Sequence, residues 1–206
     1  MATPHRSPYE VVLGGRLSEL HPRLQRYFTT IPPSHVGVGE GAFTRAGTPH
    51  RWLWPVIRVL ERRHVVFAGW ARQVPFRIQN RTIDGRAVAT REFQLPGRTW
   101  TMTDEVVCAP GGGVADRLGT PATVAATFDV STVAGALVLT SRTVGLRYGW
   151  LRVRIPRRIR PTIRLHESYD DARAQQRVDL TVDLPILGRV YGYGGYFTYR
   201  IEKEPA

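Results

Sequence analysis

The chain has 206 residues and a mass of 23.2 kDa, which is enough for one domain with a substantial hydrophobic core. Cys108 is the single cysteine, so an intramolecular disulfide is excluded, and no Cys/His spacing typical of a zinc site occurs. No apolar run approaches membrane-span length, and residues 1–8 lack the apolar core of a signal peptide. We therefore expect a soluble, cytoplasmic protein with a single domain over residues 1–206.

The formal net charge of +12 raises the question of a nucleic-acid partner. Lys203 is the only lysine, and the arginines are spread along the chain. The densest basic stretch, Arg152 to Arg164, alternates with Val and Ile, which favours a strand with a solvated basic face over a recognition helix. Nucleic acid is therefore disfavoured as a partner, although contact with phosphate or an anionic membrane stays open for this stretch.

Short helices are predicted for the first part of the chain. Ser7-Pro8-Tyr9-Glu10 has the form of a capping box with proline at the first helical position. Leucines then recur on one helical face as far as Phe28, with one proline interrupting them. Residues 36–44 are predicted to form a short strand, and residues 52–63 a further helix that Pro55 shortens or kinks.

A β-hairpin is the first element of the period-two region that begins at Val74. Asp84-Gly85 supplies the two-residue turn that joins hairpin strands. This turn predicts a register in which Ile78 faces Arg91 and Phe76 faces Phe93. A second turn at Pro96-Gly97 then places Trp100, Met102, Asp104 and Val106 on the same face as Arg91.

Further alternating segments follow at 124–130, 163–169 and 178–184, and the last, 190–201, is rich in glycine and tyrosine. The whole pattern predicts a mainly β fold (α+β), with a helical part at about 7–63 and an antiparallel β part at about 64–202. We expect a strongly curved antiparallel sheet or barrel, a lipocalin-like or START-like cup with a helix across one opening.

Four polar residues fall on faces that the alternation otherwise makes apolar: Asn80, Arg91, Asp104 and Glu167. Arg91 and Asp104 can pair across adjacent strands, and an unpaired buried charge costs roughly several kcal/mol. One interpretation is a structural ion pair, with Glu167 near the mouth and partly solvated. The other is the polar end of a ligand pocket, with Glu167 or Asp104 transferring a proton. A register shifted by one residue would instead turn all four outward.

These positions define the candidate site. The candidate catalytic residues are Glu167, Asp104 and Arg91, and the candidate ligand-binding residues are Asn80, Arg91, Phe93, Trp100, Met102, Tyr191 and Tyr193. No metal is expected, because the chain lacks the Cys/His spacing of a zinc site. No cofactor is expected either, and Gly111-Gly112-Gly113 lacks the lysine and the following helix of a phosphate loop. Ser141 and Ser168 lack the glycines of a nucleophile elbow, and Cys108 is expected to be buried, as most free cysteines are.

Several motifs resemble the bacterial family called domain of unknown function 4166. They are Val74-Pro75-Phe76, Arg91-Glu92-Phe93, Asp116-Arg117-Leu118-Gly119, Leu184-Pro185-Ile186-Leu187-Gly188 and Tyr193-Gly194-Gly195-Tyr196-Phe197. Members of the family often carry tryptophan two positions before the arginine, where this chain has Ala89, which implies extra cavity volume beside Arg91. The resemblance also implies a link to small-molecule metabolism, since the family's domain occurs fused to dinucleotide-binding oxidoreductase domains.

Three functions are compatible with the sequence. The first is binding of a lipophilic small molecule in an apolar β cavity, as an accessory in small-molecule metabolism. The second is a cofactor-free cyclase, isomerase or lyase that acts on a hydrophobic metabolite. The third is a basic module that binds nucleic acid or an anionic membrane. Whether the protein is an enzyme, and its oligomeric state, stay open.

Overall fold

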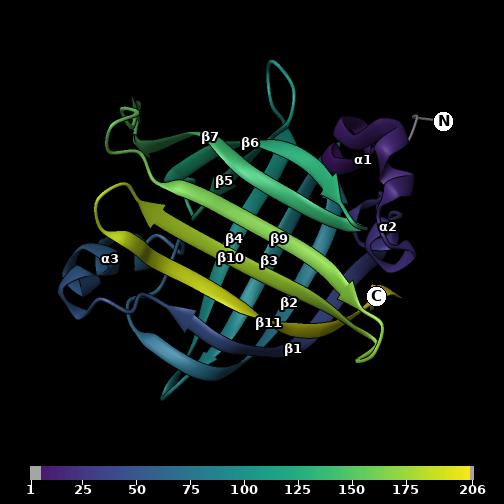
Figure 1. Ribbon diagram of the computed structural model, residues 1–206, viewed down its shortest axis with the longest axis horizontal. Coiled ribbons are helices and arrows are strands. Elements are labelled where there is room, and N and C mark those ends of the chain that lie inside the picture. The colour runs from purple at the N-terminus through teal and green to yellow at the C-terminus, as the bar shows by residue number, and fades with distance from the viewer. Residues whose placement is uncertain (1–5, 205–206) are drawn as a thin grey trace.

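A closed antiparallel β-barrel forms the body of the protein (Figure 1). The computed structural model describes residues 6–204, so most of the 1–8 segment lies outside the described residues. Neighbouring strands in the barrel follow one another along the chain, β1 pairs with β11, and β6 pairs with β7. Within the described residues this closes ten strands, while β8 pairs only with β7 and lies outside the barrel. The strands are β1 (His35–Gly47), β2 (Trp70–Ile83), β3 (Arg86–Leu95), β4 (Arg98–Cys108), β5 (Val114–Leu118), β6 (Val124–Val133), β7 (Ala136–Tyr148), β8 (Leu151–Arg154), β9 (Thr162–Asp170), β10 (Gln175–Leu184) and β11 (Gly188–Lys203).

The predicted hairpin register is confirmed. Asp84 and Gly85 both have positive φ, as the turn requires, and they join β2 to β3 with Ile78 opposite Arg91 and Phe76 opposite Phe93. Arg91 in turn lies opposite Met102 on β4. A shift by one residue is thereby excluded, and the side chains of Asp104 and Glu167 are buried on the inner face.

Glycines let β1 and β11 approach closely where the barrel closes. A Cβ atom added to Gly195 would lie 2.2 Å from the carbonyl oxygen of Ala42, and one added to Gly41 would lie 2.1 Å from that of Tyr196. Both separations are too short for any side chain, so only glycine permits this pairing. The glycine-rich end of the sequence therefore serves closure, as its pattern predicted.

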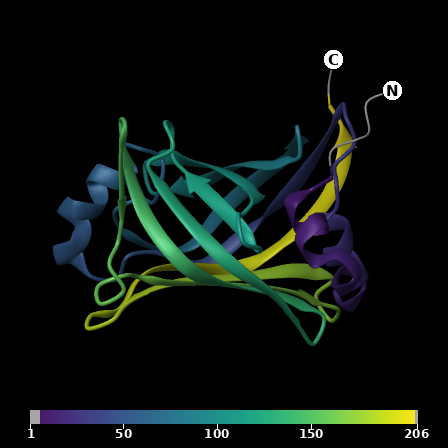
Figure 2. The ribbon, with the colours of Figure 1, turned by 90° about the horizontal axis from the view of Figure 1, so that it is seen from above.

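Helices occupy the two ends of the barrel (Figure 2). At one end lie α1 (Pro8–Leu13), the 3₁₀-helix η1 (Gly14–Glu19) and α2 (Pro22–Phe28), and α1 contacts β4, β5 and β6. At the opposite end, between β1 and β2, lie the 3₁₀-helix η2 (Arg51–Leu53) and α3 (Trp54–Glu61). We call these the α1 end and the α3 end. No helix in the described range 6–204 is long and apolar enough to cross a membrane.

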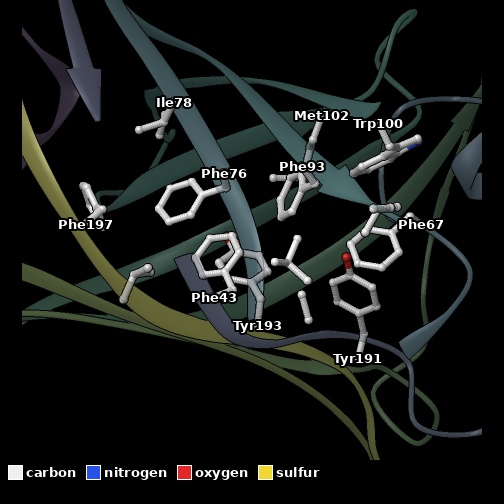
Figure 3. Packing of buried hydrophobic residues seen from close by; sticks show 14 of the residues in the cluster. Phe43, Phe67, Phe76, Ile78, Phe93, Trp100, Met102, Tyr191, Tyr193 and Phe197 are labelled. Atoms are coloured by element: carbon white, nitrogen blue, oxygen red, sulfur yellow. The ribbon is translucent and has the colours of Figure 1, made fainter. Parts of the chain in front are cut away.

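Two apolar clusters fill most of the barrel. The first is aromatic and is drawn in Figure 3; in it the rings of Phe43 and Phe76 stack with centroids 3.9 Å apart. The second joins the inner faces of β6 and β7 to Leu13, Leu24 and Phe28 of the helices at the α1 end. This second cluster anchors the helices over their opening, because their apolar side chains have no other burial.

Two local predictions were wrong. Ser7 does precede α1, but its hydroxyl makes no cap hydrogen bond. Glu10 instead accepts hydrogen bonds from Arg6 and from the hydroxyl of Thr30, which ties α1 to the start of the barrel and replaces the capping box. Cys108 is exposed, because it is the last residue of β4 and lies where the strand leaves the barrel.

Candidate functional site

A cavity of about 310 Å³ lies inside the barrel, at the lower end of the range for small-molecule sites. Its wall is mostly aliphatic and aromatic and draws on both apolar clusters. All strands of the described chain except β1 and β8 contribute lining side chains, because period-two alternation turns every second residue inward. A small group of polar side chains also lines this otherwise apolar cavity.

Arg91 and Asp104 form the ion pair expected from the sequence. Asp104 lies opposite Ala89, so the pair is diagonal across β3 and β4, and Arg91 Nη1 donates to Asp104 Oδ1. The side chains are 19% and 4% exposed, respectively, and both line the cavity. The small side chain of Ala89 also lines it, which leaves open space beside the guanidinium.

Asp116 is a third carboxyl of the cavity wall that sequence reasoning did not assign to the site. It projects from β5 between Val114 and Leu118, and its Oδ1 is buried without a hydrogen-bond partner among the described residues. Burial raises the pKa of Asp116 to about 6, although Arg91 and the backbone of Arg117 act to lower it. Alternation with Val114 and Leu118 is the signal that could have identified it.

Glu167 is deeply buried, which corrects the interpretation that placed it partly solvated at the mouth. Glu167 is only 5% exposed, and Gln176 Nε2 donates a hydrogen bond to Glu167 Oε2 at 2.5 Å. Burial raises the pKa of Glu167 to about 7, against the opposing influence of Gln176 and Arg91. Glu167 lies within β9, between Leu165 and Tyr169 on the inner face of the strand. These two side chains separate Glu167 from the two ends of the strand.

Three tyrosines complete the polar group: Tyr9 from α1, Tyr27 from α2 and Tyr193 from β11. Burial raises the pKa of each phenol, and the carboxylate of Glu167 raises all three further. These phenols therefore stay protonated and can act as hydrogen-bond donors. The sequence predicts a lining position for Tyr193, whereas Tyr9 and Tyr27 enter the cavity only because the helices fold over the α1 end.

Asn80, Met102 and Tyr191 also line the cavity, but two expected residues do not. Phe93 and Trp100 pack in the aromatic cluster, with ring centroids 5.6 Å apart (Figure 3). Trp100 Nε1 donates to the carbonyl oxygen of Glu61, which draws the indole toward the segment after β1. Both rings thus belong to the aromatic cluster and not to the cavity lining.

The charges in the cavity do not balance when every carboxyl is ionised. Arg91 neutralises Asp104, and Asp116 and Glu167 would then add two negative charges inside an apolar wall. Burial of these two carboxyls in the apolar wall is the physical cause of their raised pKa values. At neutral pH the site holds one carboxyl poised to lose a proton and one able to accept it. No three His, Cys, Asp or Glu side chains in the described range are placed to hold a metal ion.

Comparison with known proteins found no match among curated proteins or solved structures. One family model does match, that of the domain of unknown function DUF4166, over residues 20–197. The matched region starts just before α2 and runs through the glycine-rich part of β11, and it includes Arg91, Asp104, Asp116 and Glu167. The chain therefore belongs to the DUF4166 family.

Proposed function

We propose that the protein binds a lipophilic small molecule inside the barrel, as an accessory in small-molecule metabolism. The observation that carries the proposal is an apolar cavity of about 310 Å³ with Arg91, Asp104, Asp116 and Glu167 in its wall. An empty cavity lowers the stability of the folded protein, and so do buried charged side chains. A ligand with a long apolar part and one polar group would explain why one cavity contains both empty space and buried charged side chains.

The polar group of the ligand is a hydrogen-bond donor, either neutral or cationic. Arg91 is already engaged by Asp104, so a ligand carboxylate would meet the uncompensated charges of Asp116 and Glu167. A hydroxyl or ammonium group would instead satisfy Asp116 Oδ1, which has no partner among the described residues. The proposal therefore favours alcohols and amines over acids of the same chain length.

Native mass spectrometry of the protein purified from its own organism tests this directly. We expect a discrete adduct that organic extraction releases, with the mass of a lipophilic compound. An Asp116→Asn variant keeps the shape of the side chain and removes its charge, so it should lose a cationic ligand and keep a neutral one. A protein that is free of any adduct, and that also takes up none of the probes described next, would contradict the proposal.

A competition experiment tests the chemistry of the polar group. The neutral dye N-phenyl-1-naphthylamine fluoresces when it enters an apolar cavity, and dodecanol, dodecylamine and dodecanoate share one alkyl chain. We expect dodecanol and dodecylamine to displace the dye at lower concentrations than dodecanoate at pH 8, where Asp116 and Glu167 are ionised. The disadvantage of dodecanoate should shrink at pH 5, where both cavity carboxyls are protonated. Equal displacement by all three at both pH values would refute the charge argument.

A second candidate function is acid–base catalysis without a cofactor, as in an isomerase, cyclase or lyase. The observation in its favour is the pair of buried carboxyls with pKa values of about 6 and about 7, a range suited to proton transfer at neutral pH. In this proposal Glu167 moves a proton, and Arg91 stabilises a developing negative charge on oxygen.

Its test compares lipophilic cell extracts incubated with the protein and with Glu167→Gln, followed by mass spectrometry. A compound consumed by the native protein and spared by the variant would support catalysis. Glu92→Gln, at an exposed position of β3, is the matched control and should behave as the native protein. Turnover that survives Glu167→Gln would exclude Glu167 from proton transfer.

A further inference from the structure

Exposed apolar side chains gather at the α3 end of the barrel. Of the fourteen large hydrophobic residues exposed in the described chain, eleven lie at this end, and Val11, Ile83 and Val133 lie at the α1 end. Trp150 and Ile186 are each 92% exposed. Most monomeric surfaces scatter such residues singly, so their concentration at one end marks an interaction surface.

Three segments that are distant in the sequence carry ten of these eleven side chains, and Trp70 at the start of β2 is the eleventh. They are the η2–α3 segment with Trp52, Val56 and Val59, the segment from the end of β7 to the start of β9 with Trp150 and Ile159, and the β10–β11 turn with Ile186. All three lie at the same end of the barrel in both views (Figures 1 and 2). The exposed apolar residues therefore gather at one end of the barrel. We call these three segments the α3-end rim.

The α3-end rim is also strongly basic. Between positions 145 and 164 the chain has seven arginines and no acidic residue. Arg152, Arg154, Arg157 and Arg158 are exposed and have no ion-pair partner among the described residues. Several other exposed arginines are paired, as in Arg81–Glu204 at 2.6 Å and Arg177–Asp179 at 2.7 Å, whereas Arg23 and Arg26 at the α1 end have no ion pair among the described residues. A run of arginines without acidic residues thus lies among the exposed apolar tips.

The cavity reaches the same end. Ile57 and Leu60 of α3, Ile155 and Pro161 of the β8–β9 connection and Leu184 at the end of β10 all line it. The segments whose outer sides carry the exposed tips therefore contribute their inner sides to the cavity wall. A partner surface bound by the α3-end rim would therefore lie next to this end of the cavity.

We propose that the α3-end rim docks on an anionic lipid surface. The aliphatic and tryptophan tips enter the boundary between headgroups and acyl chains, and the free arginines contact lipid phosphates. Apolar side chains spread over three separate segments suit a deformable bilayer better than a protein, which would need a surface of complementary shape. Exposed Val, Ile and Leu side chains would also find no apolar surface on the phosphate backbone of a nucleic acid. Exchange of a ligand between bilayer and cavity rests on the proposed function, whereas docking itself does not.

Vesicle sedimentation of the full chain tests the docking. We expect binding to phosphatidylcholine vesicles that contain phosphatidylserine, and much weaker binding to phosphatidylcholine alone or at high salt. Arg157→Ala/Arg158→Ala should lower the partition coefficient on the order of tenfold or more. Arg23→Ala/Arg26→Ala removes the same charge from exposed positions on α2 at the α1 end and should leave binding within about twofold of the native value.

Apolar variants separate insertion from simple charge attraction. Trp150→Ala/Ile186→Ser should lower the partition coefficient on the order of tenfold, whereas Ile83→Ser/Val133→Ser at the α1 end should not change it. A fluorophore on Ile186→Cys in a Cys108→Ser background should shift to shorter wavelength with vesicles, and the same fluorophore on native Cys108 should not. These positions are exposed, so unchanged melting temperatures will verify the fold of each variant.

Several results would overturn the proposal. They are failure of the native chain to bind anionic vesicles at low salt, equal loss of binding in the α1-end controls, and binding that is insensitive to Trp150→Ala/Ile186→Ser. Retarded migration of RNA or duplex DNA that Arg157→Ala/Arg158→Ala abolishes, without vesicle binding, would assign the arginines to nucleic acid instead. Dye uptake by the docking variants should stay native, so loss of docking and loss of cavity binding are distinguishable.

Discussion

Arg91 on β3 and Asp104 on β4 form an ion pair inside the barrel, displaced by one inner-face position from direct cross-strand opposition. Because Asp104 pairs with Arg91 and Glu204 with Arg81, Asp116 and Glu167 have no ion-pair partner among the described residues. Burial raises the pKa values of these two carboxyls, and Arg91 lowers them only in part. The pairing of Arg91 with Asp104 underlies the expected preference for neutral or cationic ligands.

The ion pair itself can be tested with a double-mutant cycle. We expect Arg91→Met and Asp104→Leu each to lower the free energy of unfolding by about 3–5 kcal/mol, because each leaves the other charge buried and unpaired. The double variant should recover most of that loss, since it buries no charge of the pair. Urea unfolding at one fixed pH measures all four proteins. Strictly additive losses would mean that the two side chains do not interact.

Stability should fall as the pH rises from about 4.5 to about 7. Burial raises the pKa of Glu167 from the ordinary value of 4.5, which applies to the unfolded chain, to about 7 in the folded protein. The folded state therefore binds this proton more tightly than the unfolded state. The stabilisation is fully present below the pKa that Glu167 has in the unfolded chain, and it is lost as the pH rises past the pKa that Glu167 has in the folded protein. The free energy of unfolding should fall by roughly 3 kcal/mol in all. Asp116 acts in the same direction.

Glu167→Gln removes the Glu167 part of this pH dependence. Melting temperatures of the variant should therefore decline less steeply between pH 5 and pH 8 than those of the native protein. Glu92→Gln, on the exposed side of β3, should retain the native slope. An unchanged slope in Glu167→Gln would show that another group is responsible.

Barrel closure depends on a glycine at position 195. Its added Cβ would lie 2.2 Å from the carbonyl oxygen of Ala42 and 2.6 Å from Cα of Phe43, so β11 and β1 would have to separate. We expect Gly195→Ala to lower the free energy of unfolding by about 1–3 kcal/mol. Gly15→Ala, where no atom lies within 4 Å of the added Cβ, should be neutral or slightly stabilising. Chemical unfolding of both variants will verify the contrast.

Ala89 should control the size of the ligand site. It lines the cavity opposite Asp104, so Ala89→Trp would place an indole where the ligand's polar end is expected. We expect this variant to lose uptake of N-phenyl-1-naphthylamine. Ala125→Trp makes the same change at an exposed position of β6 and should keep native uptake. Retained uptake in Ala89→Trp would indicate that the dye binds outside the cavity.

The amino-acid sequence by itself determined the local geometry of the strands. Period-two alternation and the Asp84-Gly85 turn are properties of neighbouring residues, and together they set which side of β2, β3 and β4 faces inward. The pairing of Arg91 with Asp104 therefore follows from the sequence alone. The same reasoning applied to β5 would have placed Asp116 inside as well, because its neighbours Val114 and Leu118 share its face.

Only the tertiary structure decided what those side chains meet. The pairings of β6 with β7 and of β1 with β11 close the barrel, and closure brings Asp116 and Glu167 into the same cavity as Arg91. Packing of α1 and α2 adds Tyr9 and Tyr27, while packing against Phe67 draws Phe93 and Trp100 out of the cavity wall. Alternation along a strand says which face a residue is on, but burial and charge balance depend on segments far apart in the chain.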